Sequence, residues 1–115
     1  MIPESHPRYK SLITREKLAQ YTKTGIVSLE GLTAHGRGEA FDYLLGEETT
    51  ESALRAEKIA AALLLSANHP VISVNGNTAA LAEKEIAQLQ LASKSRVEVI
   101  LFHRTDERVQ AISGL

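Results

Sequence analysis

The sequence predicts an α/β fold, a Rossmann-like parallel sheet with flanking helices, and three observations lead to this prediction. Two short runs rich in β-branched residues, 71–74 and 97–102, are candidate strands. An amphipathic helical pattern follows each of them, and alternation of strand and helix is typical of right-handed βαβ units. The run 71–74 is apolar on both faces, as a central parallel strand should be. The 115 residues suffice for one core, so we expect a single α/β unit over residues 1–115.

The N-terminal third of the chain is expected to be mostly helical. Ser5 can cap a first helix that Gly25 ends. Residues 26–29 then predict a short strand or extended segment. Residues 40–45 predict a brief second helix, which Gly46 stops.

A longer helix is expected to follow, capped by Thr49 or Thr50. Its apolar positions recur at helical spacing and are mostly small: Ala53, Ala56, Ala60 and Leu63. Small residues let a neighbouring element come close, so this face is expected to lie against one. His69 and Pro70 end the helix before the strand at 71–74.

The C-terminal part of the chain is predicted to complete the strand and helix pattern. A helix follows the turn at 75–77, with Ala79, Ala82, Ile86 and Leu89 on its apolar side, and the strand at 97–102 comes next. Thr105 caps a last helix that stops near Ser113 after about two turns. Because two parallel strands make a poor sheet alone, we expect the fold to be truncated at the C-terminus.

Composition excludes several classes of protein. The chain is 43% hydrophobic with a net charge of −1, and it has no basic stripe interleaved with aromatic residues, which argues against disorder and against nucleic-acid binding. The absence of cysteine excludes a disulfide scaffold, a thiol nucleophile and a thiolate metal site. The apolar run 59–65 is too short to cross a membrane, and the first residues lack a signal-peptide pattern, so a cytoplasmic location is expected.

Two glycine-punctuated segments, 35–39 and 74–78, are the main candidates for a site. Each is predicted to lie just before a helix, where unpaired backbone N–H groups favour an anion. Arg37 stands between Gly36 and Gly38, and a cation at a helix entrance makes most sense beside a negatively charged ligand, which indicates a phosphate-bearing substrate. The alternative is a solvated arginine in a flexible turn.

Other residues allow a functional and a structural interpretation side by side. Arg15 lies on the apolar side of its helix, so its head reaches either solvent or an anion in a cleft. The residues Asn75, Gly76 and Asn77 follow a buried strand, where open α/β sheets bind ligands, although Asn-Gly is also a favourable turn with Asn77 as an N-cap.

The histidines show no metal-binding spacing, and no metal site is predicted from them. His35, beside the glycine segment, can serve as an acid, a base or a hydrogen-bond donor, or be structural. His69 and His103 are interpreted as structural. Glu39 and Asp42 share a helical face that could hold Mg²⁺ through water, although a solvated acidic face is the commoner outcome.

Four segments taken together, 2–9, 11–16, 34–44 and 73–81, resemble one family. They are similar to the archaeal 4-phosphopantoate–β-alanine ligases, or phosphopantothenate synthetases, of coenzyme A biosynthesis. The similarity continues through 102–105 and so covers nearly the whole chain.

The resemblance implies an AMP-forming ligase with a Rossmann-like fold that acts as a homodimer on ATP, with Mg²⁺. The carboxylate of 4-phosphopantoate attacks the α-phosphate of ATP, and the amine of β-alanine then attacks the acyl-adenylate. Two family arginines that contact ATP correspond to Arg15 and Arg37, with Gly36 and Gly38 beside the nucleotide. Arg37 and His35 would be catalytic, and residues 75–77 would line the substrate cleft.

Family members are roughly twice as long as this chain, so the resemblance implies their N-terminal half. The alternative is a non-catalytic module that binds a nucleotide or anion, or that dimerises through its alanine-rich helix. A ligase would consume ATP only when both 4-phosphopantoate and β-alanine are present, whereas a module would never release AMP.

Overall fold

The computed structural model describes residues 1–101 and 104–115, which form five helices and two strands within these ranges. In chain order they are α1 (Tyr9–Thr22), α2 (Leu29–Leu45), α3 (Glu51–Ser66), β1 (Val71–Val74), α4 (Gly76–Ser93), β2 (Arg96–Val99) and α5 (Asp106–Ser113). The predicted end of the second strand at Phe102 and the structural role predicted for His103 lie outside the described residues.

The two strands form a small parallel sheet, which confirms the predicted α/β class. Their register runs from Val71 opposite Arg96 to Val74 opposite Val99. Alternate residues of both strands face the core, and the others are exposed. The prediction that both faces of 71–74 are covered is therefore wrong for the described chain, since Val71 is 50% exposed.

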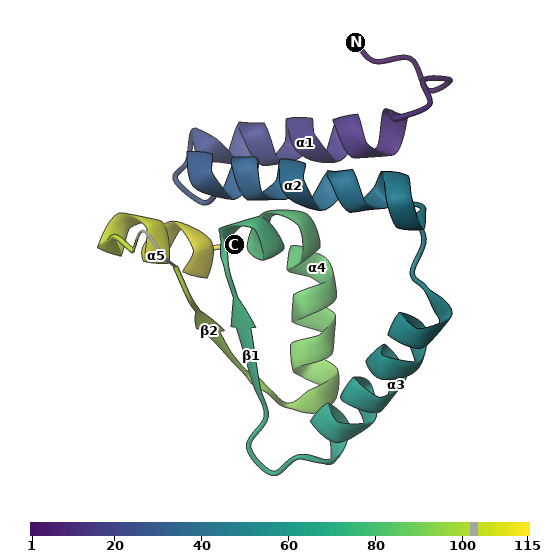
Figure 1. Ribbon diagram of the computed structural model, residues 1–115. Helices are drawn as coiled ribbons and strands as arrows, with labels where there is room; N and C mark the ends of the chain where they lie inside the picture. The colour runs from purple at the N-terminus through teal and green to yellow at the C-terminus, as the bar shows by residue number, and fades with distance from the viewer. Residues whose placement is uncertain (102–103) are drawn as a thin grey trace.

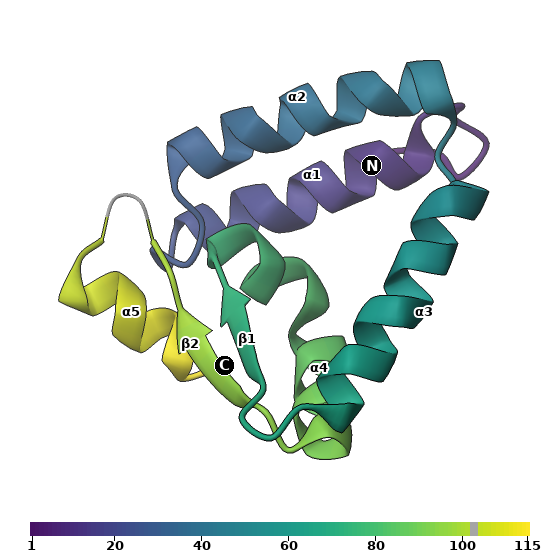
Figure 2. The same cartoon turned by 60° about the horizontal axis from the view of Figure 1, so that its bottom comes forward.

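The first two helices form an antiparallel pair at the carboxyl end of the sheet (Figures 1 and 2). Helix α4 descends beside the sheet, and α3 runs from the end of α2 down to the lower end of α4. The core lies where the loop after α1 meets the sheet, α4 and α5. Its buried members are Leu18, Ile26, Val27, Val74, Ala79, Ala80 and Ile112.

Helix α1 begins later than predicted, and the segment directly after it does not form a strand. The segment around Ser5 forms turns, with the Tyr9 N–H donating to the His6 carbonyl at 3.0 Å. Gly25, at φ +78°, lies in the turn after α1. The predicted strand at 26–29 is instead a buried bend followed by the N-cap of α2, because the Ser28 hydroxyl accepts from the Gly31 N–H.

Helix α2 runs without interruption through residues 35–39. The prediction that this segment is a turn preceding a brief helix at 40–45 is therefore wrong. Two interior glycines cost a helix about 1 kcal/mol each, but the Ser28 cap and the packing of α2 on α1 favour one continuous helix. Gly46, at φ +88°, ends the helix as predicted.

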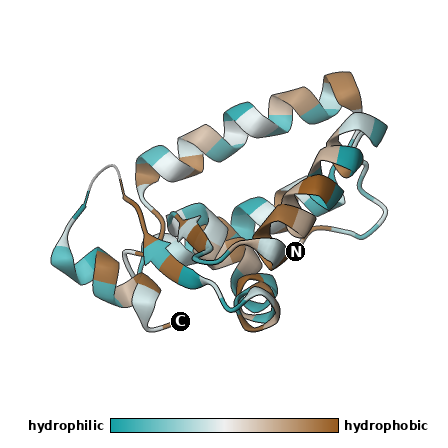
Figure 3. Cartoon of the chain, turned by 90° about the horizontal axis from the view of Figure 1, so that it is seen from below, coloured by the Kyte–Doolittle hydropathy of each residue, from teal (hydrophilic) through white to brown (hydrophobic). Residues whose placement is uncertain are grey.

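Helix α3 is capped as predicted, but most of its small-residue face is exposed in the part of the chain that the structure describes. The Thr50 hydroxyl accepts from the Ala53 N–H at 3.2 Å. Ala56 and Ala60 are exposed, and Leu63 is 65% exposed, so the predicted close packing of this face is wrong within the described chain. In Figure 3 hydrophobic (brown) and hydrophilic (teal) segments alternate along the helices.

Helix α4 begins directly after β1. Asn75 is its N-cap and accepts from the Thr78 N–H at 2.9 Å, so the alternative in which Asn77 is the cap is wrong. The helix is kinked at Ala82. Thr105 caps α5 as predicted. No helix in the described ranges has the length and apolar character needed to span a membrane.

Candidate functional site

A cleft of about 560 Å³ opens at the carboxyl end of the sheet. The first turns of α2 and α4 form two of its walls, and the segment after β2 forms a third. Its lining residues are Ser28, Glu30, Gly31, Ala34, Asn75, Gly76, Asn77, Ile100, Leu101 and Arg108. The three residues predicted from the sequence to line a substrate cleft, 75–77, therefore lie together in a cavity at the expected edge of the sheet.

Direct contacts hold the two helix starts together. The Asn77 Nδ2 donates to the Gly31 carbonyl at 2.8 Å, which joins two turns that are 46 residues apart in sequence. A Cβ on Gly31 would lie 2.7 Å from the Asn77 Oδ1, so a larger residue there would displace the Asn77 side chain from this contact. Two helix N-termini aimed at one cleft supply partial positive charge that suits an anion.

Arg108 of α5 fixes the third wall of the cleft. Its Nε donates to the Gly25 carbonyl at 2.8 Å, and its Nη2 lies 3.4 Å from the Ile26 carbonyl oxygen. The guanidinium therefore ties the last helix to the loop after α1. Its positive charge lies at the same edge of the sheet as the two helix N-termini. Glu30 is the one carboxylate among the described lining residues.

A second cluster of charged residues joins α1 to α2 around the Glu39 carboxylate. Glu39 is only 5% exposed and accepts from Arg15 Nη2 at 2.6 Å and from Arg15 Nε at 3.1 Å. Arg8 Nη2 donates to it at 2.9 Å, and His35 Nε2 lies 3.2 Å away. The hydrogen bond from Arg15 holds the pKa of the Glu39 carboxyl below its ordinary value, although burial opposes this shift. The same bond raises the pKa of Arg15.

Arg37 does not join this cluster. Residues two apart on a helix point in nearly opposite directions, so Arg37 lies on the face of α2 away from Glu39. It is exposed, and none of the described residues makes a hydrogen bond or ion pair with its side chain. Its predicted setting at a helix entrance is wrong, because Gly36 and Gly38 are interior helical residues with open space around them. A role in binding ATP stays a prediction.

The structure corrects the sequence-based view of Glu39. It was expected on a face with Asp42, either solvated or holding Mg²⁺ through water. It is instead buried and neutralised by two arginines. Within the described residues no group of three or more His, Asp or Glu side chains is arranged to hold a metal ion.

Sequence reasoning missed Arg8, Arg108 and the partner of Arg15. The spacing of His35 and Glu39, four apart on one helix, could have predicted their contact. Arg15 and Glu39 are 24 residues apart on separate helices, so no local pattern pairs them.

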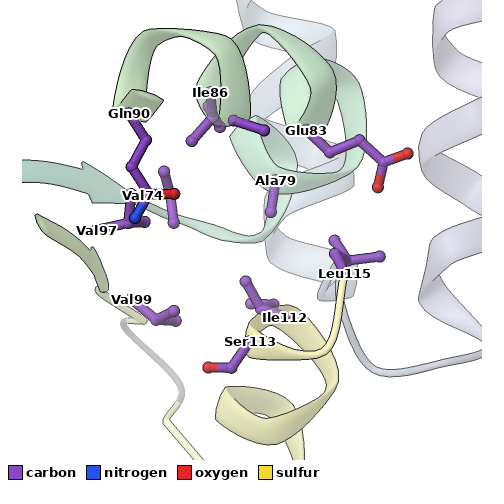
Figure 4. A pocket seen from close by; sticks show the side chains of 11 residues that line it. Val74, Ala79, Glu83, Ile86, Gln90, Val97, Val99, Ile112, Ser113 and Leu115 are labelled. Atoms are coloured by element: carbon purple, nitrogen blue, oxygen red, sulfur yellow. The ribbon is translucent and has the colours of Figure 1, made fainter. Parts of the chain in front are cut away.

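A second cavity, of about 300 Å³, lies between α4, the sheet and α5 (Figure 4). The side chains that point into it are mostly apolar, including Val74, Ile86, Val99 and Ile112. Glu83 is the one ionisable side chain among its described lining residues. This cavity is therefore a loosely filled part of the core, and it offers little chemistry.

The chain is similar in sequence to known proteins of one family. A sequence model of the phosphopantothenate/pantothenate synthetase family matches residues 52–115. The chain is 97% identical over all its residues to a 4-phosphopantoate–β-alanine ligase of Methanospirillum hungatei, of which it covers 47%. It is 60% identical to the ligase of Methanosarcina mazei and 55% identical to that of Thermococcus kodakarensis, covering 44% and 43% of those proteins.

The chain thus spans about half the length of the curated relatives that it matches. The family match covers nearly all of α3 together with β1, α4, β2 and α5, and so includes the start of α4 and the segment after β2 that line the cleft, but not the first turn of α2. The identity with the relatives extends over the α1–α2 pair as well. The chain belongs to the phosphopantothenate/pantothenate synthetase family.

Proposed function

We propose that the natural protein containing this chain condenses 4-phosphopantoate with β-alanine, at the expense of ATP, to give 4′-phosphopantothenate for coenzyme A biosynthesis. The observation that carries this proposal is the cleft at the carboxyl end of the sheet, where two helix N-termini converge. A substrate with both a phosphate and a carboxylate suits such a site. The names of the relatives, one of them 97% identical to this chain, support the same reaction.

The proposed chemistry needs alignment and charge neutralisation rather than a protein nucleophile. The substrate carboxylate attacks the α-phosphorus of ATP, and pyrophosphate leaves. The amine of β-alanine then attacks the acyl carbon of the mixed anhydride, loses a proton, and AMP leaves as the amide forms. Developing negative charge in both steps is best stabilised by fixed cations and backbone N–H groups.

As the resemblance implies, we propose that Arg15 and Arg37 both contact ATP, with Gly36 and Gly38 leaving the surface beside Arg37 open for the nucleotide. Because Arg15 binds Glu39 on one face of α2 and Arg37 lies on the opposite face, the two arginines would contact different parts of the nucleotide. Support comes from the partly exposed head of Arg15 and the open surroundings of both glycines. The residues Asn75, Gly76 and Asn77 would line the substrate cleft. His35 and Arg37 are proposed as the catalytic residues, and the ring of His35 lies against Glu39.

No step is assigned to Mg²⁺. Glu39 is occupied by arginines, and the described residues offer no set of metal ligands, so the residues present do not fit a protein-held ion. Any Mg²⁺ would enter with the ATP phosphates that it binds in solution.

Three further properties belong to the proposal. Residues 1–115 would form one α/β unit in the N-terminal half of the domain. Strands from the rest of the natural protein would complete its sheet to a Rossmann-like fold. Two copies would form a homodimer through the alanine-rich face of α3, which is exposed in this chain. The enzyme would act in the cytoplasm, where coenzyme A is made.

The experiment that tests the proposal measures AMP release by the full-length natural protein. Release should require ATP, 4-phosphopantoate and β-alanine together, and Arg37→Ala should reduce it at least about 100-fold with the fold intact. Arg55→Ala is the matched control, because Arg55 is an exposed arginine paired only with Glu51 among the described residues. Nucleotide binding without AMP release would instead favour the non-catalytic module.

A further inference from the structure

Arg8, the residue that precedes α1, shares the buried carboxylate of Glu39 with Arg15. Both arginines donate to the same oxygen, Oε2, at 2.9 and 2.6 Å. The Arg8 guanidinium also lies over the ring of Tyr43, with its carbon 5.1 Å from the ring centroid. Glu39 of α2 therefore brings together the guanidinium groups of Arg8 and Arg15, which are about two helical turns apart along the chain.

The cluster carries more positive than negative charge. Two guanidinium groups face one carboxylate. The Nε atom of Arg8 is buried and has no hydrogen-bond partner among the described residues. A buried donor left without a partner is costly, and the ion pair with Glu39 leaves this one unused. An anion with several oxygen atoms, bound to the exposed parts of the two arginine side chains, would balance the charge.

Both arginine side chains are partly accessible to an anion from solvent. The heads of Arg8 and Arg15 are accessible, since their side chains are 38% and 43% exposed. A separate cleft of about 410 Å³ lies beside Glu39, but neither arginine lines it. That cleft carries the carboxylates of Asp42, Glu47 and Glu48 and would repel an anion.

We propose that Arg8 contacts the phosphate chain of the nucleotide together with Arg15, and that Glu39 is the positioning residue that holds both guanidinium groups side by side. This inference rests on the proposed function, because it assumes that Arg15 binds ATP. Fixing two arginines on one buried carboxylate lowers the entropy lost when they bind phosphate, and it offsets their mutual repulsion. Each guanidinium keeps further N–H groups for the ligand.

The first experiment compares Arg8→Ala with Arg55→Ala in the full-length natural protein. We expect Arg8→Ala to raise the KM for ATP roughly 10- to 100-fold, and to weaken binding of inorganic tripolyphosphate, measured by calorimetry, by a similar factor. Arg8→Lys should restore only part of the loss, since lysine keeps the charge but not the guanidinium fork. Arg55→Ala should leave both quantities unchanged.

A KM for ATP within about twofold of wild type in folded Arg8→Ala overturns the inference. If Arg15→Ala and Arg37→Ala still abolish AMP release in that case, the proposed function stands while the role of Arg8 fails. If the wild-type protein releases no AMP, the proposed function fails. Tripolyphosphate binding then tests the anion site of Arg8 and Arg15 separately.

Glu39→Gln tests the positioning role. We expect a higher KM for ATP with kcat changed much less, in protein assayed well below its melting temperature. A purely structural role for Glu39 predicts a lower melting temperature with the KM for ATP unchanged in the folded protein, which would refute positioning. If Glu39→Gln does not fold, the comparison of Arg8→Ala with Arg8→Lys decides the proposal.

Discussion

Gly76, the first residue of α4, lies so close to Ile26 that a Cβ at position 76 would overlap the Ile26 carbonyl oxygen. The carbonyl carbon of Ile26 would lie 3.1 Å from the same Cβ. This approach brings the start of α4 against the loop between α1 and α2. Gly76 also lines the cleft at the carboxyl end of the sheet.

Gly76→Ala should therefore destabilise the protein by about 1–3 kcal/mol, because the obstructing atom is backbone and cannot rotate away. The measurement is the free energy of unfolding in urea. The free energy would stay within about 0.5 kcal/mol of wild type if α4 could shift without loss, and that result would contradict the close approach.

Gly38→Ala is the matched glycine substitution, since a Cβ there would meet nothing within 4 Å. Because Gly38 is interior to α2, alanine should stabilise the protein by about 0.5–1 kcal/mol. If Gly38 keeps the surface open for the nucleotide, the same variant should show a raised KM for ATP. An unchanged KM in the more stable protein would remove Gly38 from the proposed ATP site.

The pH dependence of stability should carry the signature of Glu39. Its folded pKa is lowered, chiefly by the hydrogen bond from Arg15. The contribution of Glu39 to the free energy of unfolding is therefore fully present above the carboxyl's unfolded pKa of about 4.3. This contribution is lost as the pH falls through its lowered folded pKa.

Unfolding measured from pH 7 to pH 3 should show a larger fall in stability for wild type than for Glu39→Gln, which has no titrating group at this position. Glu51→Gln is the control, because Glu51 is an exposed carboxylate whose ion pair with Arg55 is also exposed. Parallel curves for wild type and Glu39→Gln would show that Glu39 has the same pKa in both states.

The proposed homodimer can be tested on α3. Ala60→Glu places a charge on the face that Ala56 and Leu63 share, and it should weaken dimerisation by at least about tenfold. Ala62→Glu introduces the same charge on the opposite side of the helix, where the residue is also exposed. Sedimentation of both variants of the full-length natural protein would measure their dimer dissociation constants. Equal constants for Ala60→Glu and Ala62→Glu would place the dimer interface on another surface.

Local patterns predicted those features of the fold that depend on neighbouring residues in sequence. Such features depend on side chains within a few positions of the backbone that they affect. They are the strand at 71–74, the N-caps Thr50 and Thr105, and the end of α2 at Gly46. The segment 35–39 was misinterpreted because glycine favours a turn locally. Packing of α2 against α1 overrides a cost of about 1 kcal/mol per glycine.

The candidate site was predictable only in part, for the same reason. Asn75, Gly76 and Asn77 could be assigned to a cleft because the residues after a parallel strand lie at its carboxyl end, whatever the details of packing. Arg15 could be singled out by its place on the apolar side of a helix. The carboxylate that binds it could not, because Glu39 belongs to another helix.

The sequence by itself determined the α/β class, the order of the later strands and helices, the helix caps Thr50 and Thr105, and the resemblance that the comparisons bear out. Only the tertiary structure decided that Glu39 is buried between Arg8 and Arg15 while Arg37 points away. It also decided that Gly31 and Gly76 let α2 and α4 meet at one cleft. The physical reason is that caps and strands are short-range properties, whereas burial, ion pairs and close backbone approach depend on residues brought together from distant parts of the chain.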